Sequence, residues 1–336
     1  MKSFFALLAV LALATGCAHV SNPRADFSRL VGLPHVALAP QIEKISDANG
    51  LAQFHFAFSS DANHRVPGIL IEPENISGRH PVVIALHGTG GNKENMIPLC
   101  RKLAERGFIA VAIDGRYHGE RKSGKNDYND AIVEAYRGSG EHPFFYDTVF
   151  DVMRLVDYLQ TRDDVDARRI GLIGISKGGV ETYLTAAMDE RITVAVPCIG
   201  MQSFSWALKN NDWQGRIGTI QGAFDTITKS EGVAGPDSAF VKKFYDRVIP
   251  GIYTEFDGPQ CIALIAPRPL LFINSDSDNH TPIAGVQECV AAARKIYSAK
   301  NADEKLSVII QPNTGHKVLP DSERAAIDWF ARWLKP

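Results

Sequence analysis

Residues 171–179 read Gly-Leu-Ile-Gly-Ile-Ser-Lys-Gly-Gly, and the pentapeptide Gly174-Ile175-Ser176-Lys177-Gly178 within them decides the fold. The apolar run 170–175 is typical of a strand and 180–188 contains good helix formers, so a sharp strand–turn–helix connection is predicted. The glycines at both ends have no side chains to collide across such a turn, which holds its central residue in a strained backbone conformation. Ser176 is therefore predicted to be presented as a nucleophile and not buried.

A serine hydroxyl is a weak nucleophile at neutral pH, so it needs a histidine to accept its proton and a carboxylate to orient that histidine. After a turn of this type, the acid follows a later strand and the histidine follows the last strand. The apolar run 269–274 leads into a loop that contains Asp278, and the run 305–310 leads into a loop that contains His316. We therefore predict that Ser176, Asp278 and His316 form a catalytic triad.

Neighbours of the predicted acid offer alternatives for two of these roles. Asp276 stands nearer the end of the strand, whereas Asp278 lies in the loop before Thr281-Pro282, which resembles a helix start. Asp278 is the preferred acid and Asp276 the reserve, although aspartates in such loops commonly stabilise turns or cap helices. His280 is the rival of His316 as the base, but it lies too close in sequence to the acid to face it across a site.

A glycine-rich loop, His87-Gly88-Thr89-Gly90-Gly91, follows the apolar run 81–86, which is typical of a buried parallel strand. Acyl transfer needs two N–H donors directed at the oxyanion, and we assign them to the backbone N–H groups of Lys177 and Thr89. His87 is then a structural residue of the loop and not a second base. A plain strand-to-helix loop is the alternative interpretation.

Strands and helices are predicted to alternate along most of the chain. The strand candidates are 81–86, 108–113, 170–175, 192–196, 269–274 and 307–311, and the helical stretches are 94–106, 146–160, 180–188, 283–297 and 322–334. Strict alternation predicts an α/β protein with a mostly parallel sheet and helices on both faces. Two further runs, 53–58 and 66–71, predict an antiparallel hairpin at the edge of the sheet.

Residues 201–266 interrupt this alternation. The region has no convincing buried strand but several aromatic residues among charges, which predicts an inserted helical cap. Trp206 and Trp213 are its candidate substrate-pocket residues, although aromatic side chains that only pack the insert onto the main domain would give the same pattern. A second long loop is expected at 117–142.

The order of these elements resembles that of the α/β-hydrolase superfamily. The resemblance extends to three further stretches and to the Ser176 pentapeptide; the stretches are Asp114-Gly115-Arg116-Tyr117-His118-Gly119-Glu120-Arg121, Asp166-Ala167-Arg168-Arg169-Ile170 and Ile265-Ala266-Pro267-Arg268-Pro269. Over residues 50–336 the chain most resembles dienelactone-hydrolase-like and acetyl-xylan-esterase-like serine esterases. The resemblance implies a Ser-Asp-His acyl-enzyme mechanism, with Ser176, Asp278 and His316 at the matching positions. It also implies short-chain or acetyl esters, including carbohydrate esters, as substrates.

Lys177 departs from this family pattern. A neutral residue often follows the nucleophile in these esterases, whereas an arginine does so in the similar glucuronoyl esterases. A side-chain cation here could bind a carboxylated sugar or stabilise the oxyanion. The alternative is a lysine that projects into solvent from the first helical turn.

Other functions share the same sequence features. The triad order also serves prolyl-peptidase-like serine peptidases, and the pentapeptide also fits a glucuronoyl-type esterase. The third alternative is a non-catalytic binding protein on the hydrolase fold. A binding role would require none of the Ser176 turn, the acid, the base and the oxyanion loop, so their joint presence argues against it.

Composition is typical of a single soluble catalytic domain, which we place at 51–336. The chain has 336 residues, of which 45% are hydrophobic and 22% charged, so it can bury a large core. A net charge of −2 gives no electrostatic signature of nucleic-acid binding. The histidines and cysteines lack the spacing of a metal site, so we expect no metal and no cofactor, and an ester substrate as the partner.

Residues 1–17 are typical of an export signal. Met1-Lys2-Ser3 precedes the apolar run 4–14, and small residues lead directly into Cys17. This arrangement resembles the bacterial lipoprotein signal, in which the cysteine is lipidated; ordinary secretion is the alternative. We expect a protein anchored through Cys17 to a bacterial membrane, facing the periplasm or the outside, with 18–50 as tether and N-terminal extension.

Export would place the four remaining cysteines, Cys100, Cys198, Cys261 and Cys289, where disulfides persist. Four cysteines allow three complete pairings, and the sequence does not select one. A bridge from Cys198 to Cys261 would connect the two ends of the cap.

Overall fold

The computed structural model describes residues 22–124 and 127–334. The predicted export signal and the predicted lipidation site Cys17 lie outside these ranges. Within them, none of the helices is both long enough and apolar enough to span a membrane.

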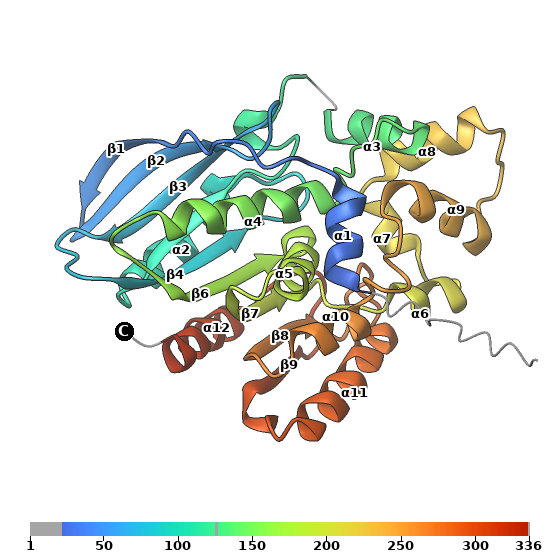
Figure 1. Ribbon diagram of the computed structural model, residues 1–336. Helices are drawn as coiled ribbons and strands as arrows, with labels where there is room; N and C mark the ends of the chain where they lie inside the picture. Colours follow the sequence, from blue (N-terminus) through green and yellow to red (C-terminus); the bar gives the residue numbers. More distant parts are fainter. Residues whose placement is uncertain (1–21, 125–126, 335–336) are drawn as a thin grey trace, which may run out of the picture.

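A nine-stranded sheet forms the centre of the described molecule (Figure 1). The strands are β1 (Gln41–Ala48), β2 (Leu51–Ser59), β3 (Arg65–Pro73), β4 (His80–Leu86), β5 (Ile109–Ile113), β6 (Val165–Ile175), β7 (Ile192–Cys198), β8 (Leu270–Ser275) and β9 (Leu306–Gln311). Their order across the sheet is β1-β2-β3-β5-β4-β6-β7-β8-β9. The six strands from β5 to β9 in this order are parallel, and β1, β2 and β3 form an antiparallel edge. The predicted α/β class, the six parallel strands and the hairpin of β2 and β3 are confirmed.

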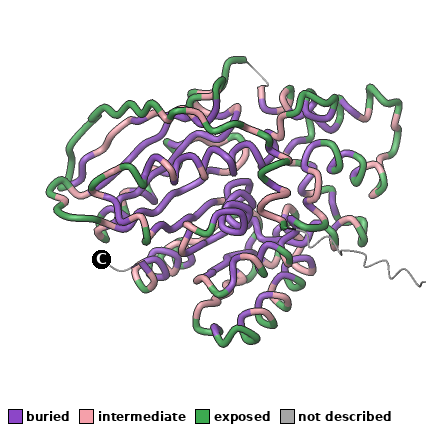
Figure 2. Tube along the Cα trace, viewed as in Figure 1, coloured by how far each residue is buried: buried purple, intermediate pink, exposed green. Residues whose placement is uncertain are grey.

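Helices cover both faces of the sheet. Since successive side chains of a strand point to opposite faces, each central strand contributes residues to two hydrophobic clusters, one on each face. On β4, Val82, Ile84 and Leu86 belong to one hydrophobic cluster, and Val83 and Ala85 to another. The first cluster includes residues of α4 (Tyr146–Gln160), α5 (Lys177–Met188), α10 (Gly258–Ile265) and α11 (Ile283–Ala299). The second includes α2 (Ile97–Ala104) and α12 (Pro320–Trp333). Burial on both faces explains why the central strands read as continuous apolar runs (Figure 2).

The chain reverses its direction across the sheet at β4. β5 lies on one side of β4, and β6, the next strand in the chain, lies on the other. The loops that leave the carboxyl ends of β4 and β6 therefore diverge, and ligands of open parallel sheets bind in the crevice between such loops. Thr89 lies in the first of these loops and Ser176 in the second.

Five helices and no strand occupy residues 204–265, as predicted for the inserted cap: α6 (Phe204–Lys209), α7 (Gln214–Gly218), α8 (Gln221–Ser230), α9 (Ser238–Val248) and α10. A further helix, α3 (Asp127–Arg137), packs against α8 and α9 (Figure 1). The segment 117–142 is therefore not the uninterrupted loop expected from the sequence. The spacing of the buried residues Tyr128, Ile132 and Tyr136 is helical and is the signal that could have revealed α3. Three short 3₁₀ helices complete the fold: η1 (Lys93–Met96), η2 (Gly119–Arg121) and η3 (Asp303–Lys305).

The expected tether at 18–50 is wrong for its described central part, because residues 23–31 fold onto the catalytic domain as the helix α1 (Pro23–Val31). Asn22 caps the helix, and Phe27 is 1% exposed between the rings of Tyr146 and Phe256. The Arg24 guanidinium donates to the carbonyl groups of Ala187 and Leu264. A helix with a buried aromatic anchor does not act as a flexible linker.

The bridge between Cys198 and Cys261 is also wrong. All four described cysteines are free and buried. Cys198 belongs to the hydrophobic cluster on one face of the sheet and Cys261 to the cluster on the other, so the sheet separates the two thiols.

Candidate active site

Ser176 occupies the sharp turn between β6 and α5 that the sequence predicts. Its φ of 59° lies in the left-handed region, which costs energy for a residue with a side chain. A Cβ atom at Gly174 would lie 2.1 Å from the carbonyl oxygen of Gly178, and one at Gly178 would lie 2.5 Å from that of Leu86. Only glycine fits at either position, so these two residues permit the turn.

Ser176 is less exposed than predicted, because only 8% of its surface reaches solvent. Neighbouring loops cover it. A Cβ atom at Gly88 would lie 3.4 Å from the Ser176 Cβ, and one at Gly200 would lie 2.7 Å from the Ser176 carbonyl oxygen. The glycines at these two positions let both loops approach the serine closely.

The three predicted triad residues come together from three different loops. The Ser176 Oγ lies 2.7 Å from the Nε2 of His316, and the Nδ1 of His316 lies 2.7 Å from the Oδ2 of Asp278. An ionised carboxylate only accepts hydrogen bonds, so the proton of a neutral His316 ring is on Nδ1 and its Nε2 accepts from the serine hydroxyl. This geometry leaves the imidazole ready to take the serine proton.

Asp278 is buried at 3% exposure, and three donors surround its carboxylate. Besides His316, the Thr281 hydroxyl donates to Oδ2 over 2.7 Å and the His280 backbone N–H donates to Oδ1 over 2.8 Å. Burial alone would raise the pKa of Asp278, but the hydrogen bonds from His316 and Thr281 outweigh it and lower the pKa to about 2. Asp278 therefore stays ionised at neutral pH.

The two alternative residues have other partners. The Asp276 carboxylate accepts from the backbone N–H groups of Asn313 and Thr314, so it connects the acid loop to the histidine loop. The Nδ1 of His280 contacts the carbonyl oxygen of Gly215, and its ring meets the His316 ring edge-on at 4.5 Å. Within the described part of the chain, neither residue forms a hydrogen bond with Ser176, whereas His316 does.

The loop after β4 lies against the nucleophile, as expected for an oxyanion loop. His87 is 3% exposed; its Nδ1–H donates to the Gly88 carbonyl over 2.8 Å and its Nε2 accepts from the Gly115 N–H over 3.0 Å. Burial, with help from the Lys177 charge, lowers the pKa of His87 to about 4, so the ring is neutral. His87 thus has the structural role that the sequence predicts, because it connects the loops after β4 and β5.

Lys177 begins α5, and its side chain follows neither sequence interpretation. As the first helical residue, its backbone N–H has no acceptor within the helix and remains free to serve as a donor. The side chain is 1% exposed and its ammonium group forms an ion pair with Glu181, 5.8 Å from the centre of the Tyr128 ring. The lysine therefore does not project into solvent, and Glu181 already compensates its charge.

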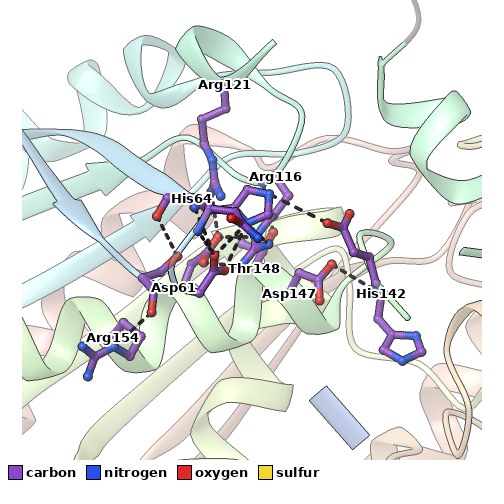
Figure 3. A network of polar contacts seen from close by, with 12 residues as sticks. Asp61, His64, Arg116, Arg121, His142, Asp147, Thr148 and Arg154 are labelled. Carbon is purple, nitrogen blue, oxygen red and sulfur yellow. Dashed lines mark hydrogen bonds and ion pairs between the residues drawn. The ribbon is translucent and has the colours of Figure 1, made fainter. Parts of the chain in front are cut away.

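Arg116 forms the centre of a buried charged network below the loop after β5 (Figure 3). Its guanidinium donates to both carboxylate oxygens of Asp151 on α4, over 3.0 and 3.1 Å, and to Asp61 over 2.7 Å. Burial would raise the pKa of Asp151, but the charges of Arg116 and Arg121 hold it well below its usual value. The network fixes the loop that contains Tyr117 and His118. Sequence reasoning quoted this segment only for its family resemblance and missed the role of Arg116.

Arg216 of α7 lies below the acid loop and was also missed. The residue is 3% exposed, and no described carboxylate forms an ion pair with it. In one of its two orientations, the Gln202 side-chain amide forms hydrogen bonds through both its oxygen and its nitrogen. The oxygen accepts from the Arg216 Nε over 2.9 Å, and the nitrogen donates to the His280 carbonyl over 3.2 Å. Arg216 thus supports the backbone next to Asp278. An isolated arginine in a helical insert gives no sequence signal for such a role.

A cavity of about 240 Å³ begins at Thr89. Its wall comes from the loop after β4, the loop after β5, the start of α3 and Thr219 at the end of α7. Trp206 and Trp213 are not among the residues that line it, so the structure does not place these two predicted pocket residues at this cavity. A Cβ atom at Gly285 of α11 would lie 3.2 Å from the Trp206 ring, and the Trp213 ring packs 6.0 Å from that of Phe224. Both tryptophans stabilise the insert.

This fold, with a serine at the turn after β6 and a histidine after the last strand, defines a serine hydrolase of the α/β-hydrolase superfamily. The profile of the acetyl xylan esterase (AXE1) family matches residues 30–205, just over half of the chain, so the protein belongs to that family. It is a serine carboxylic ester hydrolase.

Individual relatives agree with this assignment. The hydrolase YtaP of Bacillus subtilis (strain 168) is 25% identical over 287 residues, which cover 82% of this chain and 85% of that protein. A 4-O-methyl-glucuronoyl methylesterase of Neurospora crassa is 25% identical over 187 residues, which cover 54% of this chain and 45% of that protein. Acetyl xylan esterase 1 from Thermoanaerobacterium sp. JW/SL YS485 superposes with a TM-score of 0.70, at 17% identity and 94% coverage of both chains, which shows the common fold.

Proposed function

We propose that the protein hydrolyses carbohydrate esters through a covalent acyl-enzyme formed on Ser176. The observation that carries this proposal is the unbroken hydrogen-bond chain from Ser176 Oγ through His316 to Asp278, with both distances at 2.7 Å. The ionised Asp278 carboxylate can only accept from the His316 Nδ1–H, which leaves Nε2 of the ring as the acceptor for the serine proton.

Each half of the reaction transfers one proton through His316. Ser176 Oγ attacks the ester carbonyl carbon while Nε2 takes the hydroxyl proton; the tetrahedral intermediate then expels the alcohol, which receives that proton. Water attacks the resulting acyl-serine with His316 again as base, and the acid leaves as Ser176 regains its proton. Asp278 stays ionised throughout and stabilises the transient imidazolium.

We assign the oxyanion hole to the backbone N–H groups of Lys177 and Thr89. The first is free of intrahelical partners and lies at the positive end of the α5 dipole. The second belongs to the loop that approaches Ser176 through Gly88. Removal of one such donor in a serine hydrolase costs roughly 10²–10³ in rate.

Acetyl groups on carbohydrates are the first substrate class we propose, because the chain belongs to the acetyl xylan esterase family. Esters of glucuronic-acid-type sugars are the second, and the similarity to the Neurospora crassa glucuronoyl methylesterase favours them. The two classes place the sugar on opposite sides of the scissile bond: acetylated sugars provide the alcohol, whereas uronate esters provide the acid.

Hydrolysis of p-nitrophenyl acetate to octanoate by the protein without residues 1–17, compared with its Ser176→Ala variant, tests the mechanism. We expect the highest rates on short chains and a loss of at least about 10³-fold in the variant. Acetate release from acetylated xylan then tests the carbohydrate class. An equally active Ser176→Ala protein would contradict the assigned nucleophile.

We also propose that the protein is exported and lipidated at Cys17, after cleavage of a signal that ends at Gly16. The support is the sequence of residues 1–17 alone. Mass spectrometry of the mature amino terminus tests it: a diacylglyceryl-cysteine terminus that disappears in Cys17→Ser would agree with lipidation. An unmodified terminus at another small residue would indicate ordinary secretion.

A further inference from the structure

His280 contacts both the acid and the base of the candidate triad. Its backbone N–H donates to the Asp278 Oδ1 over 2.8 Å. The centre of its ring lies 4.5 Å from that of the His316 ring, and the two ring planes meet at 82°. An edge-on pair of this kind is a favourable arrangement of two flat rings. His280 is therefore not a rival of His316 but packs against it.

The inserted cap holds the His280 ring. A carbonyl oxygen only accepts hydrogen bonds, so Nδ1 of His280 carries a proton and donates to the carbonyl of Gly215 on α7. The helix comes this close because Gly215 has no side chain: a Cβ atom there would lie 1.7 Å from the Asn279 carbonyl oxygen. In the amide orientation described above, Gln202 also donates to the His280 carbonyl. Two segments of the insert thus fix this one residue of the acid loop.

The His280 ring is neutral at neutral pH. Burial lowers the pKa of His280 below its ordinary value, and the positive charges of His316 and Arg216 act in the same direction. The Gly215 carbonyl and Asp278 oppose this shift without reversing it. A neutral ring places no second positive charge beside His316 when that residue becomes an imidazolium. Since Nδ1 already donates to the cap, the residue is suited to orient the base and not to replace it.

His316 needs such a support because one of its two hydrogen bonds changes during the reaction. In the resting site Nδ1 donates to Asp278 and Nε2 accepts from Ser176. Once Nε2 has taken the serine proton, it must direct that proton toward the leaving alcohol, and the hydrogen bond to Asp278 alone then holds the ring. The His316 side chain is 25% exposed, so the surrounding loops do not enclose it. A neighbouring ring that limits its movement matters here, because small misplacements of a reacting group are costly.

We propose that His280 is a positioning residue: held by the cap, its ring keeps His316 aligned while Nε2 exchanges the serine for the leaving alcohol. The inference rests on the proposed function, because it takes His316 as the base of the Ser176 acyl-enzyme reaction. His280 itself transfers no proton; the proton that moves goes from Ser176 to Nε2 and from there to the alcohol. The cap therefore contributes to the reaction through the acid loop.

Three substitutions at residue 280 separate the ring from its hydrogen bond, and all of them keep the backbone N–H that donates to Asp278. His280→Phe keeps a flat ring and loses the donor to Gly215. His280→Asn keeps an N–H donor near the position of Nδ1 and loses the ring, and His280→Ala loses both. Two acetate esters are compared, because p-nitrophenolate leaves without a proton whereas ethanol leaves only with the proton from Nε2 of His316.

We expect kcat/KM of His280→Ala to fall about tenfold on ethyl acetate, the size of one lost contact between rings, and less than about threefold on p-nitrophenyl acetate. His280→Phe should recover most of the loss on ethyl acetate, and His280→Asn should not. A merely structural role would lower the rates on both esters equally, because damage to the fold does not distinguish their leaving groups. Thermal unfolding of each variant checks that the fold is retained.

His142→Ala is the matched control. The Nδ1 of His142 also donates to a cap carbonyl, that of Val248 over 3.2 Å, and its ring packs 6.0 Å from that of Tyr146. Within the described part of the chain, however, it forms no hydrogen bond with any residue of the candidate triad. The rates on both esters should therefore stay close to those of the wild type.

Equal losses on the two esters, an unchanged His280→Ala protein, or recovery by His280→Asn instead of His280→Phe would overturn the inference. So would a wild type without measurable activity on ethyl acetate, because no leaving alcohol would then need the proton. In each of these cases, loss of p-nitrophenyl acetate hydrolysis in Ser176→Ala leaves the proposed function standing. If Ser176→Ala stays active, both fail.

Discussion

Lys177 and Glu181 form a buried ion pair one helical turn apart on α5, immediately after the nucleophile. Both side chains are 1% exposed, and burial raises the pKa of Glu181 although the Lys177 charge opposes that shift. The pair lies close to His87 and Tyr128, and thus between the oxyanion loop and the cavity wall. A pair in this position fixes the first turn of the helix that we assign to the oxyanion hole.

Removing one partner of this pair should destabilise the protein more than replacing both partners with apolar residues. Glu181→Gln leaves a buried ammonium group without its counterion, and we expect a loss of about 3–5 kcal/mol in the free energy of unfolding. The double variant Lys177→Met/Glu181→Leu should recover most of that loss. Urea denaturation of both variants provides the measurement. A double variant as unstable as Glu181→Gln would show that the charges themselves are required.

Exchanging the acid of the triad should separate Asp278 from Asp276. We expect Asp278→Asn to lower kcat by about 10³–10⁴-fold, because the amide favours the wrong tautomer of His316. Asp276→Asn weakens only the hydrogen bonds from Ser277, Asn313 and Thr314, so it should lower kcat less than about tenfold. Steady-state kinetics on p-nitrophenyl acetate decides the matter, and the opposite order would assign the acid role to Asp276.

Arg116→Met should unfold the protein at much lower denaturant concentration than the wild type. The substitution leaves the carboxylates of Asp151 and Asp61 buried with much of their compensating charge gone, at a cost of about 3–5 kcal/mol. Arg116→Lys retains the charge but loses the bidentate contact to Asp151, so an intermediate loss is expected. Unfolding in urea, monitored by circular dichroism, gives both values. No change in either variant would refute a structural role for the network.

Arg216→Met should behave in the opposite way, because no carboxylate is left unpaired when this guanidinium is removed. We expect stability within about 1 kcal/mol of the wild type or higher, together with a lower kcat, since Gln202 loses the partner that holds it against His280. Comparing the melting temperature and kcat of Arg216→Met with those of Arg116→Met tests this contrast. A large destabilisation with unchanged kcat would contradict it.

Asp147 should make stability depend on pH in the mildly acidic range. Burial raises the pKa of Asp147 to about 7, from 3.8 in the unfolded chain, although the Arg116 charge and the His142 N–H oppose the shift. The protonated form is thus favoured on folding, so this contribution is complete below pH 3.8 and is lost as the pH rises through 7. In Asp147→Asn, the decline in unfolding free energy between pH 4 and 7 should become shallower than in the wild type. An unchanged slope would exclude this assignment.

The sequence was sufficient to predict the candidate catalytic residues, because a local sequence pattern and the order of the strands point to the same positions. Ser176, Asp278 and His316 could be chosen because each follows an apolar run, and parallel strands deliver their carboxyl ends to one edge of the sheet. β1 was missed because all of its residues are exposed, so it has no apolar pattern. The prediction of a bridge between Cys198 and Cys261 was wrong because the two residues lie on opposite faces of the sheet. When both faces of a strand are buried, its continuous apolar sequence does not indicate which face a given residue occupies.

What the sequence determined by itself is therefore the superfamily, the parallel sheet and the three residues that the structure joins in one hydrogen-bonded chain, because glycine spacing and apolar runs encode local backbone geometry. The tertiary structure alone decided the surroundings of these residues. The burial of Lys177 against Glu181, the Arg116 network, the support from Arg216 and the cavity beside Thr89 all join segments far apart in the chain. Such contacts depend on how loops and helices pack against one another, so they cannot be predicted from a local sequence pattern.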